Sequence, residues 1–256
     1  MEELAHHLHL KNGDVGRYVL LPGDPGRCEH IASYLDEPML MAHFREYKTY
    51  TGTLLGEKVS VTSTGIGGPS TAIAFEELVE LGADTFIRVG TSGGMQPGMH
   101  PGDLAIISGA IRDEGTTMHY MPMAFPAISD IQIVNALIEA AARLDNTHHV
   151  GIAHSKDSFY GQHTPERMPV ASRLLDRWEA WKQGGAICSE MEASTLCVLG
   201  SIYRKRAGGI MLIAINQEGT DEDMVPCTDI SELLETSIEA VKILIEGDRK
   251  QTVTRD

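Results

Sequence analysis

The chain has 256 residues, 42% of them hydrophobic, which is enough to bury one substantial core. Its formal net charge of −15 at pH 7 argues against nucleic acid and acidic membranes as partners, so a small anionic ligand would need a local cluster of positive charge. No window of about 18 uncharged apolar residues occurs, and the N-terminus lacks a basic region followed by an apolar one, so we expect neither a membrane span nor a signal peptide.

Short β-branched or aliphatic runs alternate with helical patterns along the chain. The predicted strands are residues 18–21, 47–54, 59–64, 85–89, 104–107, 150–153, 186–189 and 209–215. Apolar residues at helical spacing predict helices over 70–81 and 229–245. Helices that follow strands at this interval indicate a mostly parallel α/β sheet, part of it closing toward a barrel, with helices on its faces.

The chain shows no internal repeat, low-complexity tract or linker, so we predict a single domain over residues 1–256. Within it, the polar stretch 217–228 is predicted to be a mobile loop and the tail 247–256 to fray. The cysteines Cys28, Cys188, Cys197 and Cys227 have no paired spacing, which indicates reduced thiols and a cytoplasmic protein.

Three glycine-rich loops follow predicted strands and could hold phosphate. In LLPGDPGR, Gly23 lets the backbone approach a ligand and Arg27 begins the next helix. In RVGTSGG, Arg88 and Thr91 come to the carboxyl end of a strand, the usual ligand edge of such sheets. The third loop, STGIGGPS at 63–70, directly precedes a helix. Each loop alone could be an ordinary turn, and neither a dinucleotide fingerprint nor a P-loop occurs, which argues against hydrolysis of nucleoside triphosphates.

Together and in this order, these loops and the runs FREYKTYTG (44–52), DSFYGQ (157–162) and SEMEAST (189–195) resemble the hexameric nucleoside phosphorylase family. The resemblance extends from His7 to about Ile245 and is closer to the uridine phosphorylase branch. It implies one α/β domain around a distorted mixed sheet and a homohexamer arranged as a trimer of dimers. The implied reaction is reversible phosphorolysis of uridine to uracil and ribose 1-phosphate, with the use of deoxyuridine left open.

The resemblance also implies where phosphate binds. Gly23, Arg27, Arg88 and Thr91 match its phosphate site, and Arg45 would reach in from the neighbouring subunit. Guanidinium groups match phosphate oxygens bidentately and stay charged, and they would supply the positive field that the acidic chain otherwise lacks. Inorganic phosphate is thus a co-substrate, and no other cofactor is expected.

For the ribose, the resemblance implies Met191 and Glu192, with Glu190 beside them and His7 contributed by the partner subunit. A carboxylate that accepts sugar hydroxyl protons suits a reaction in which the sugar carbon becomes positively charged. We therefore expect Glu192, together with the two arginines at 27 and 88, to be catalytic.

For the base, Phe159 is expected to stack on the ring and Gln162 to bond its edge. The uridine enzymes have an arginine two residues after this glutamine. Arg167 can take the place of that arginine here only if the loop bulges. A second base-site arginine of these enzymes corresponds to Gln217. The purine branch has a catalytic aspartate at about Asn216 or Gln217, and its absence favours pyrimidines.

The uridine enzymes also hold a monovalent cation on the dimer axis, and Glu46, Ile66 and Ser70 match its ligands. A structural potassium ion is the only metal expected. We assign no chemistry to His148, His149, His154 and His163, because no serine or cysteine beside them forms a nucleophile arrangement.

Two kinds of alternative function stay open. One is a purine nucleoside phosphorylase or a nucleosidase that uses water on the same fold. The other is a noncatalytic nucleoside or phosphate sensor.

Overall fold

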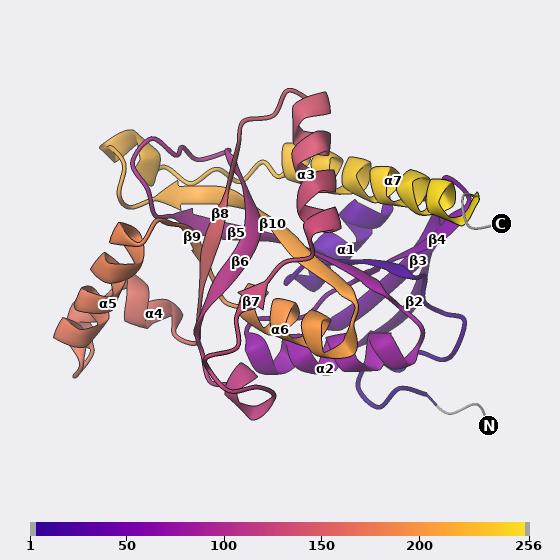
Figure 1. Ribbon diagram of the computed structural model, residues 1–256, viewed down its shortest axis with the longest axis horizontal. Coiled ribbons are helices and arrows are strands. Elements are labelled where there is room, and N and C mark those ends of the chain that lie inside the picture. The colour runs from indigo at the N-terminus through magenta and orange to yellow at the C-terminus, as the bar shows by residue number, and fades with distance from the viewer. Residues whose placement is uncertain (1–3, 254–256) are drawn as a thin grey trace.

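The computed structural model describes residues 4–253 as an α/β structure built on one ten-stranded mixed sheet (Figure 1). The strands are β1 Tyr18–Leu21, β2 Asp36–Phe44, β3 Tyr47–Leu54, β4 Glu57–Thr62, β5 Thr85–Gly94, β6 Leu104–Asp113, β7 Ala127–Ile128, β8 His148–Lys156, β9 Ala186–Glu190 and β10 Arg206–Asn216. The helices are α1 Pro25–Ala32, α2 Gly68–Glu80, α3 Ile131–Arg143, α4 Phe159–His163, α5 Ala171–Gln183, α6 Ala193–Tyr203 and α7 Ser231–Val253, with 3-10 turns at Thr117–His119, Pro165–Arg167 and Asp221–Met224.

Part of the sheet closes on itself. Strand β10 pairs with both β5 and β6, β8 joins β6 to β9, and β9 pairs back to β5, so these five strands form a barrel. The open part continues from β5 through β1, β4 and β3 to β2 at the edge. The predicted α/β class, with a distorted mixed sheet that closes toward a barrel between helices, is confirmed.

Two apolar layers cover the open part of the sheet. Along β1, Tyr18 and Leu20 face the layer under α1, α3 and α7, while Val19 and Leu21 face the layer over α2 and α6. This alternation follows from the period of two in a strand. Figure 1 shows α3 and α7 on one side of the sheet and α2 with α6 on the other. The side chains of β1 are buried on both faces, so the loop that follows it starts from a fixed position.

The sequence located eight strands but underestimated several lengths. Strands β5, β6, β8 and β10 extend through residues that the periodicity left out. The glycine-containing end of β5 continues to pair with β10 as far as Gly94 and Asn216, and β6 continues to pair with β8 as far as Asp113 and Lys156. The prediction missed β2, which pairs only with β3, is interrupted by register shifts and exposes most of its side chains. It also missed the two-residue β7.

The tail 247–256 was predicted to fray, and its described part is helical, since α7 continues to Val253. Asp248 on α7 accepts hydrogen bonds from Tyr18 at 2.6 Å and from Arg206 at 2.6 and 2.9 Å, which ties the last turns to β1 and β10. Residues 254–256, like residues 1–3 of the predicted domain, lie outside the described range.

The polar stretch 217–228 contains a short 3-10 turn held by local contacts. Asp223 accepts hydrogen bonds from the backbone and hydroxyl of Thr220 at 2.7 and 2.9 Å, and His100 lies 2.7 Å from its other oxygen. These hydrogen bonds, that of His100 first, lower the pKa of Asp223 to about 2. The mobility of this loop stays a prediction. Within residues 4–253, no helix combines the length and the apolarity that crossing a membrane requires.

Candidate active site

A cavity of about 760 Å³ opens where the carboxyl-terminal parts of several strands meet. It is of the size usual for sites that bind small molecules. Residues that are far apart in the sequence line it: the loop after β1, the middle of β5, the ends of β8 and β9, and β10. The predicted site residues among them are Gly23, Arg27, Glu46, Ile66, Ser70, Arg88, Thr91, Phe159, Glu190, Met191 and Glu192.

Arg88, on β5, is the central cation of this cavity. Only 5% of the residue is exposed, and its Nη2 donates to Glu192 Oε2 at 2.5 Å. Its Nε lies 3.9 Å from Glu190 Oε2, and neither Nε nor Nη1 has a hydrogen-bond partner in the described chain. Buried donors without partners are rare, because leaving them unbonded costs free energy. A bound oxyanion would satisfy the unbonded N–H groups.

Two glycines make room for this guanidinium. A Cβ added to Gly23 would lie 3.4 Å from Arg88 Nη1, and one added to Gly90 would lie 3.2 Å from Nη2 and 2.6 Å from Met211 Sδ. Both glycines therefore let the backbone approach the charged group closely, whereas the sequence analysis expected Gly23 to let the backbone approach a ligand.

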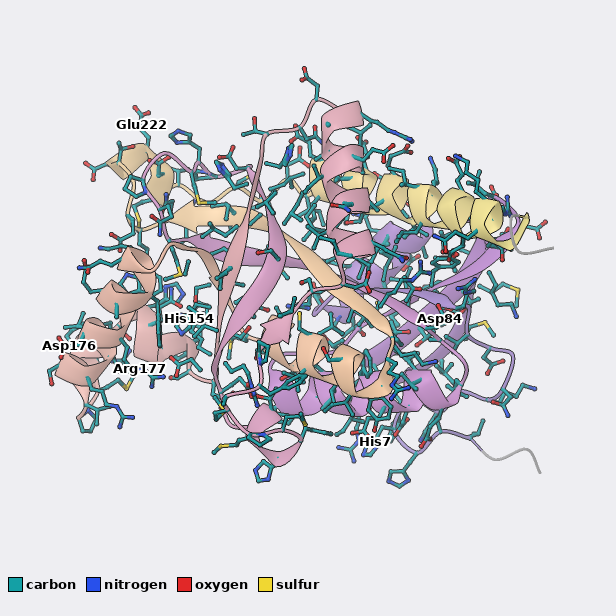
Figure 2. All side chains as sticks on the ribbon, viewed as in Figure 1. His7, Asp84, His154, Asp176, Arg177 and Glu222 are labelled. Atoms are coloured by element: carbon teal, nitrogen blue, oxygen red, sulfur yellow. The ribbon has the colours of Figure 1, made fainter. Side chains whose placement is uncertain are left out.

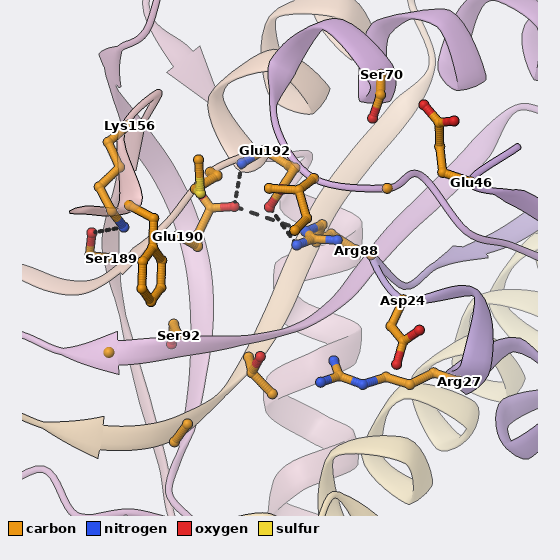
Figure 3. Close-up of a pocket in the computed structure, with 18 of the residues that line it drawn as sticks. Asp24, Arg27, Glu46, Ser70, Arg88, Ser92, Lys156, Ser189, Glu190 and Glu192 are labelled. Carbon is orange, nitrogen blue, oxygen red and sulfur yellow. Dashed lines mark hydrogen bonds and ion pairs between the residues drawn. The ribbon is translucent and has the colours of Figure 1, made fainter. Parts of the chain in front are cut away.

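Arg27 approaches the same space from α1. Asp24 caps this helix by accepting a hydrogen bond from the backbone of Gly26 at 2.8 Å, which places Arg27 in the first turn. Figure 3 shows the guanidinium groups of Arg27 and Arg88 facing the cavity from neighbouring elements. Burial lowers the pKa of Arg27, and the positive charge of Arg88 lowers it further against the opposing effect of Asp24. An anion between the two arginines would relieve this repulsion.

Glu190 and Glu192 lie where β9 turns into α6. Both oxygens of Glu190 are hydrogen-bonded within the protein: one accepts from the backbone of Glu192 and Ala193 at 2.8 Å each, and the other from the hydroxyl of Ser155. Burial and the charge of Glu192 raise the pKa of Glu190. Glu190 thus fixes the turn, whereas Glu192 faces Arg88 and accepts from the backbone of Gly67 at 2.6 Å.

The end of the cavity away from Arg27 is aromatic. Phe159, at the start of α4, is half exposed, and its ring lies 4.1 Å from that of His163 between centroids, with an interplanar angle of 35°. Both rings line the cavity. A flat heterocycle placed here would find a stacking surface.

The family pattern of the phosphorylase superfamily matches residues 17–246. The chain belongs to this superfamily. It is similar to a uridine phosphorylase of Treponema pallidum, with 49% identity over 96% of both chains, and to a uridine phosphorylase of Thermococcus kodakarensis, with 46% identity over 98% of this chain and 90% of that one. It is also 38% identical to a guanosine phosphorylase of Halorubrum lacusprofundi over 85% of this chain and 88% of that one.

Two residues that the superfamily resemblance assigned to the base do not line the main cavity. Gln162 lines an adjoining cavity of about 390 Å³, with its Oε1 accepting a hydrogen bond from Ser189 at 2.7 Å. Arg167 is exposed in the 3-10 turn after α4 and lines neither cavity. The loop therefore does not bring Arg167 to the position of the expected arginine. Gln217, at the second arginine position, lies 3.1 Å from His163 Nδ1.

His7 and Arg45 lie away from the cavity of their own chain. His7 Nδ1 is 2.6 Å from Glu77 Oε1, on the outer side of α2, and Figure 2 shows it far from His154 beside the cavity. Arg45 is exposed at the turn between β2 and β3, with its guanidinium 5.5 Å from the ring centre of Phe44. The action of these side chains in another subunit's site stays a prediction.

Glu46, Ile66 and Ser70 gather at one side of the cavity. A Cβ added to Gly65 would lie 2.8 Å from Glu46 Cγ and 3.1 Å from Ser70 Oγ, so the two side chains flank this glycine. Ser70 donates its proton to the carbonyl oxygen of Thr64, which leaves the hydroxyl lone pairs free to face a cation. The side chain of Ile66 is a hydrocarbon, so only the backbone oxygen of this residue suits such a ligand set.

The sequence analysis missed five polar residues that line the cavity: Asp24, Ser92, Lys156, His163 and Ser189. The useful signal was position. Lys156 is the last residue of β8, which extends beyond the strand predicted at 150–153, and it directly precedes the DSFYGQ run. Ser189 is the first residue of the SEMEAST run. Since strand ends are the ligand edge of such sheets, polar residues there could have been included.

Proposed function

We propose that this chain is a pentosyltransferase that catalyses the reversible phosphorolysis of uridine to uracil and ribose 1-phosphate. The family membership and the uridine phosphorylase names of relatives that match nearly the whole chain support this activity. The observation that carries it in the structure is the buried Arg88, which has N–H groups without a partner in the described chain and lines one cavity with Arg27 and Glu192.

In this mechanism Arg27 and Arg88 hold phosphate beside the anomeric carbon. A phosphate oxygen attacks that carbon while the bond to the base nitrogen breaks, and its electron pair leaves on the uracil ring. Glu192 accepts hydrogen bonds from the ribose hydroxyls and stabilises the positive charge that develops on the sugar. Its carboxylate has about four acceptor positions, so it can bond ribose in addition to Gly67 and Arg88. Met191 and Phe159 pack against the sugar and the base.

The surroundings of Asn216 support a pyrimidine over a purine. Asn216 is fully buried, and its amide nitrogen donates to the backbone oxygens of Gln96 and Met99 at 2.8 Å each. Its side-chain oxygen accepts from the backbone of Glu218 at 3.1 Å. This side chain therefore has no proton to offer a purine ring. The guanosine phosphorylase among the relatives makes a purine nucleoside the specific alternative to exclude.

The test is to incubate the protein with uridine, deoxyuridine, inosine or guanosine, each with and without inorganic phosphate. We expect uracil release from uridine only with phosphate. Release of uracil without phosphate would indicate a nucleosidase. Preferential cleavage of guanosine or inosine would indicate a purine phosphorylase. Saturable uridine binding without any release of uracil would indicate a sensor.

The proposal includes self-association, because Arg45 and His7 do not line the cavity of their own chain. In a homohexamer built as a trimer of dimers, Arg45 would reach the phosphate and His7 the ribose of the neighbouring subunit. Glu46, Ile66 and Ser70 would hold a structural potassium ion between subunits, without a part in the chemistry. We place the enzyme in cytoplasmic nucleoside catabolism and pyrimidine salvage, to which its free cysteines are suited.

A further inference from the structure

Lys156 is a buried cation inside the candidate active site that the mechanism above does not use. It ends β8, and only 6% of the residue is exposed. Its Nζ donates a hydrogen bond to Ser189 Oγ at 2.8 Å. Within residues 4–253 no carboxylate forms an ion pair with it at 4.0 Å or less. An ammonium group has three donors, so two of them are left for a ligand.

Such an arrangement is costly for the free protein. Burial lowers the pKa of Lys156, and the more distant carboxylates of Glu190 and Glu192 oppose this effect. Buried charges are normally paired, because removing them from water without a partner is unfavourable. A lysine kept here without a close carboxylate is placed to meet negative charge on a bound molecule.

The position of Lys156 shows which part of the substrate it meets. Figure 3 shows Lys156 on the opposite side of Glu190 and Glu192 from Arg27. Phe159 lines the same cavity. The phosphate oxygens would lie at the arginine end, and Glu192 would take the ribose. What remains at the lysine end is the base, stacked on Phe159 and His163.

The chain also lacks the usual cationic groups for that end. The family resemblance led us to expect an arginine at two base-site positions. One of them holds Gln217, which lies against His163. For the other, the nearby Arg167 is exposed and lines neither cavity. The uracil ring, however, leaves with a negative charge that a donor must stabilise. Lys156 is the cation that the structure offers for it.

We propose that Lys156 is a catalytic residue that donates a hydrogen bond to a ring carbonyl oxygen of the departing pyrimidine; this inference rests on the proposed function. As the phosphate oxygen bonds to the anomeric carbon, the glycosidic bond breaks and its electron pair spreads over the two carbonyl oxygens of uracil. Lys156 remains protonated and holds one of them. The uracil anion takes its proton from water on release.

Ser189 acts as a positioning residue for this group. It accepts from Lys156 and donates to Gln162 Oε1 at 2.7 Å, so one hydroxyl links the two side chains. Gln162 itself lines the adjoining cavity, so of these three side chains Lys156 and Ser189 line the main one, and only Lys156 carries a charge.

The first test measures binding and needs no turnover. Uracil is neutral near pH 7, whereas 5-nitrouracil is an anion there and imitates the charged leaving group. We expect the unaltered enzyme to prefer 5-nitrouracil. Lys156→Met should weaken 5-nitrouracil binding by about tenfold to a hundredfold, the range for one hydrogen bond to a charged group, and uracil binding far less. Lys242→Met is the control and should change neither, because Lys242 is a partly exposed residue of α7 that does not line the cavity.

The second test measures leaving-group dependence. Lys156→Met should reduce kcat/KM more for uridine than for 5-fluorouridine, whose base leaves more readily as an anion. The anion preference of the unaltered enzyme should fall as pH rises through the lowered pKa of Lys156, and this alkaline fall should be absent from the variant. Lys156→Arg keeps a cation and should retain much of the preference.

Equal weakening of uracil and 5-nitrouracil, or an unchanged preference in Lys156→Met, would overturn the role of Lys156. If that variant does not fold, Lys156→Gln provides the same comparison and should also lose the preference. Absence of uridine cleavage by the unaltered enzyme would instead refute the proposed function, a result that the binding measurements distinguish from failure at Lys156.

Discussion

Replacing Arg88 by lysine tests the phosphate assignment directly, because the change keeps the charge and removes the fork of donors. Arginine has five N–H donors. Nη2 of Arg88 donates to Glu192, while Nε and Nη1 have no partner in the described chain. Lysine has a single nitrogen, which the two neighbouring carboxylates attract. We therefore expect Arg88→Lys to lose at least one charged hydrogen bond to phosphate.

The expected magnitude follows from that loss. A hydrogen bond to a charged group contributes about 1.5–3 kcal/mol, which corresponds to roughly a tenfold to hundredfold reduction in kcat/KM for phosphate. The assay is initial rate against phosphate concentration at saturating uridine, accompanied by thermal unfolding. Arg206→Lys is the matched control, since Arg206 is also a largely buried, ion-paired arginine of this sheet but lies away from the cavity.

Two results would refute the reasoning. One is an unchanged kcat/KM for phosphate in a folded Arg88→Lys enzyme. The other is an equal loss in Arg206→Lys, which would show that reduced stability and not phosphate contact lowers the rate.

Two further predictions concern the assembly and the C-terminal helix. The Arg45→Ala and Arg88→Ala variants should each be nearly inactive. When the two are co-expressed, about a quarter of the sites should regain activity, since a mixed dimer has one site with both arginines. No recovery of activity in purified mixed oligomers would contradict a shared site. Asp248→Asn should lower Tm without changing KM, because Asp248 binds Arg206 and Tyr18 away from the cavity. Burial raises the pKa of Asp248, but these hydrogen bonds outweigh burial and lower it. Asp248 therefore stabilises the folded protein at pH values above its pKa in the unfolded chain, and this stabilisation is lost as pH falls through its pKa in the folded protein. The difference in Tm should therefore be largest near neutral pH and shrink in acid, and a constant difference would argue against the ion pair.

The amino-acid sequence alone was sufficient for the features that depend on local patterns. Short β-branched or aliphatic runs identified β1 and β3 at their observed bounds, because such runs are typical of strands. The order of the glycine loops and the SEMEAST run was specific enough to assign the family and to select Arg27, Arg88 and Glu192, which the structure places around one cavity.

Tertiary structure decided what depends on contacts between distant residues. Tyr18 and Asp248 are 230 positions apart, so no local pattern could show that the last turns of α7 are held in place. Likewise, a lysine at the end of a strand looks like any solvated charge until β8, β9 and α4 enclose it with Ser189 and Phe159. Burial and the absence of a close carboxylate, the two properties that make Lys156 chemically significant, exist only in the folded chain, because both are set by neighbours that the sequence does not place beside it.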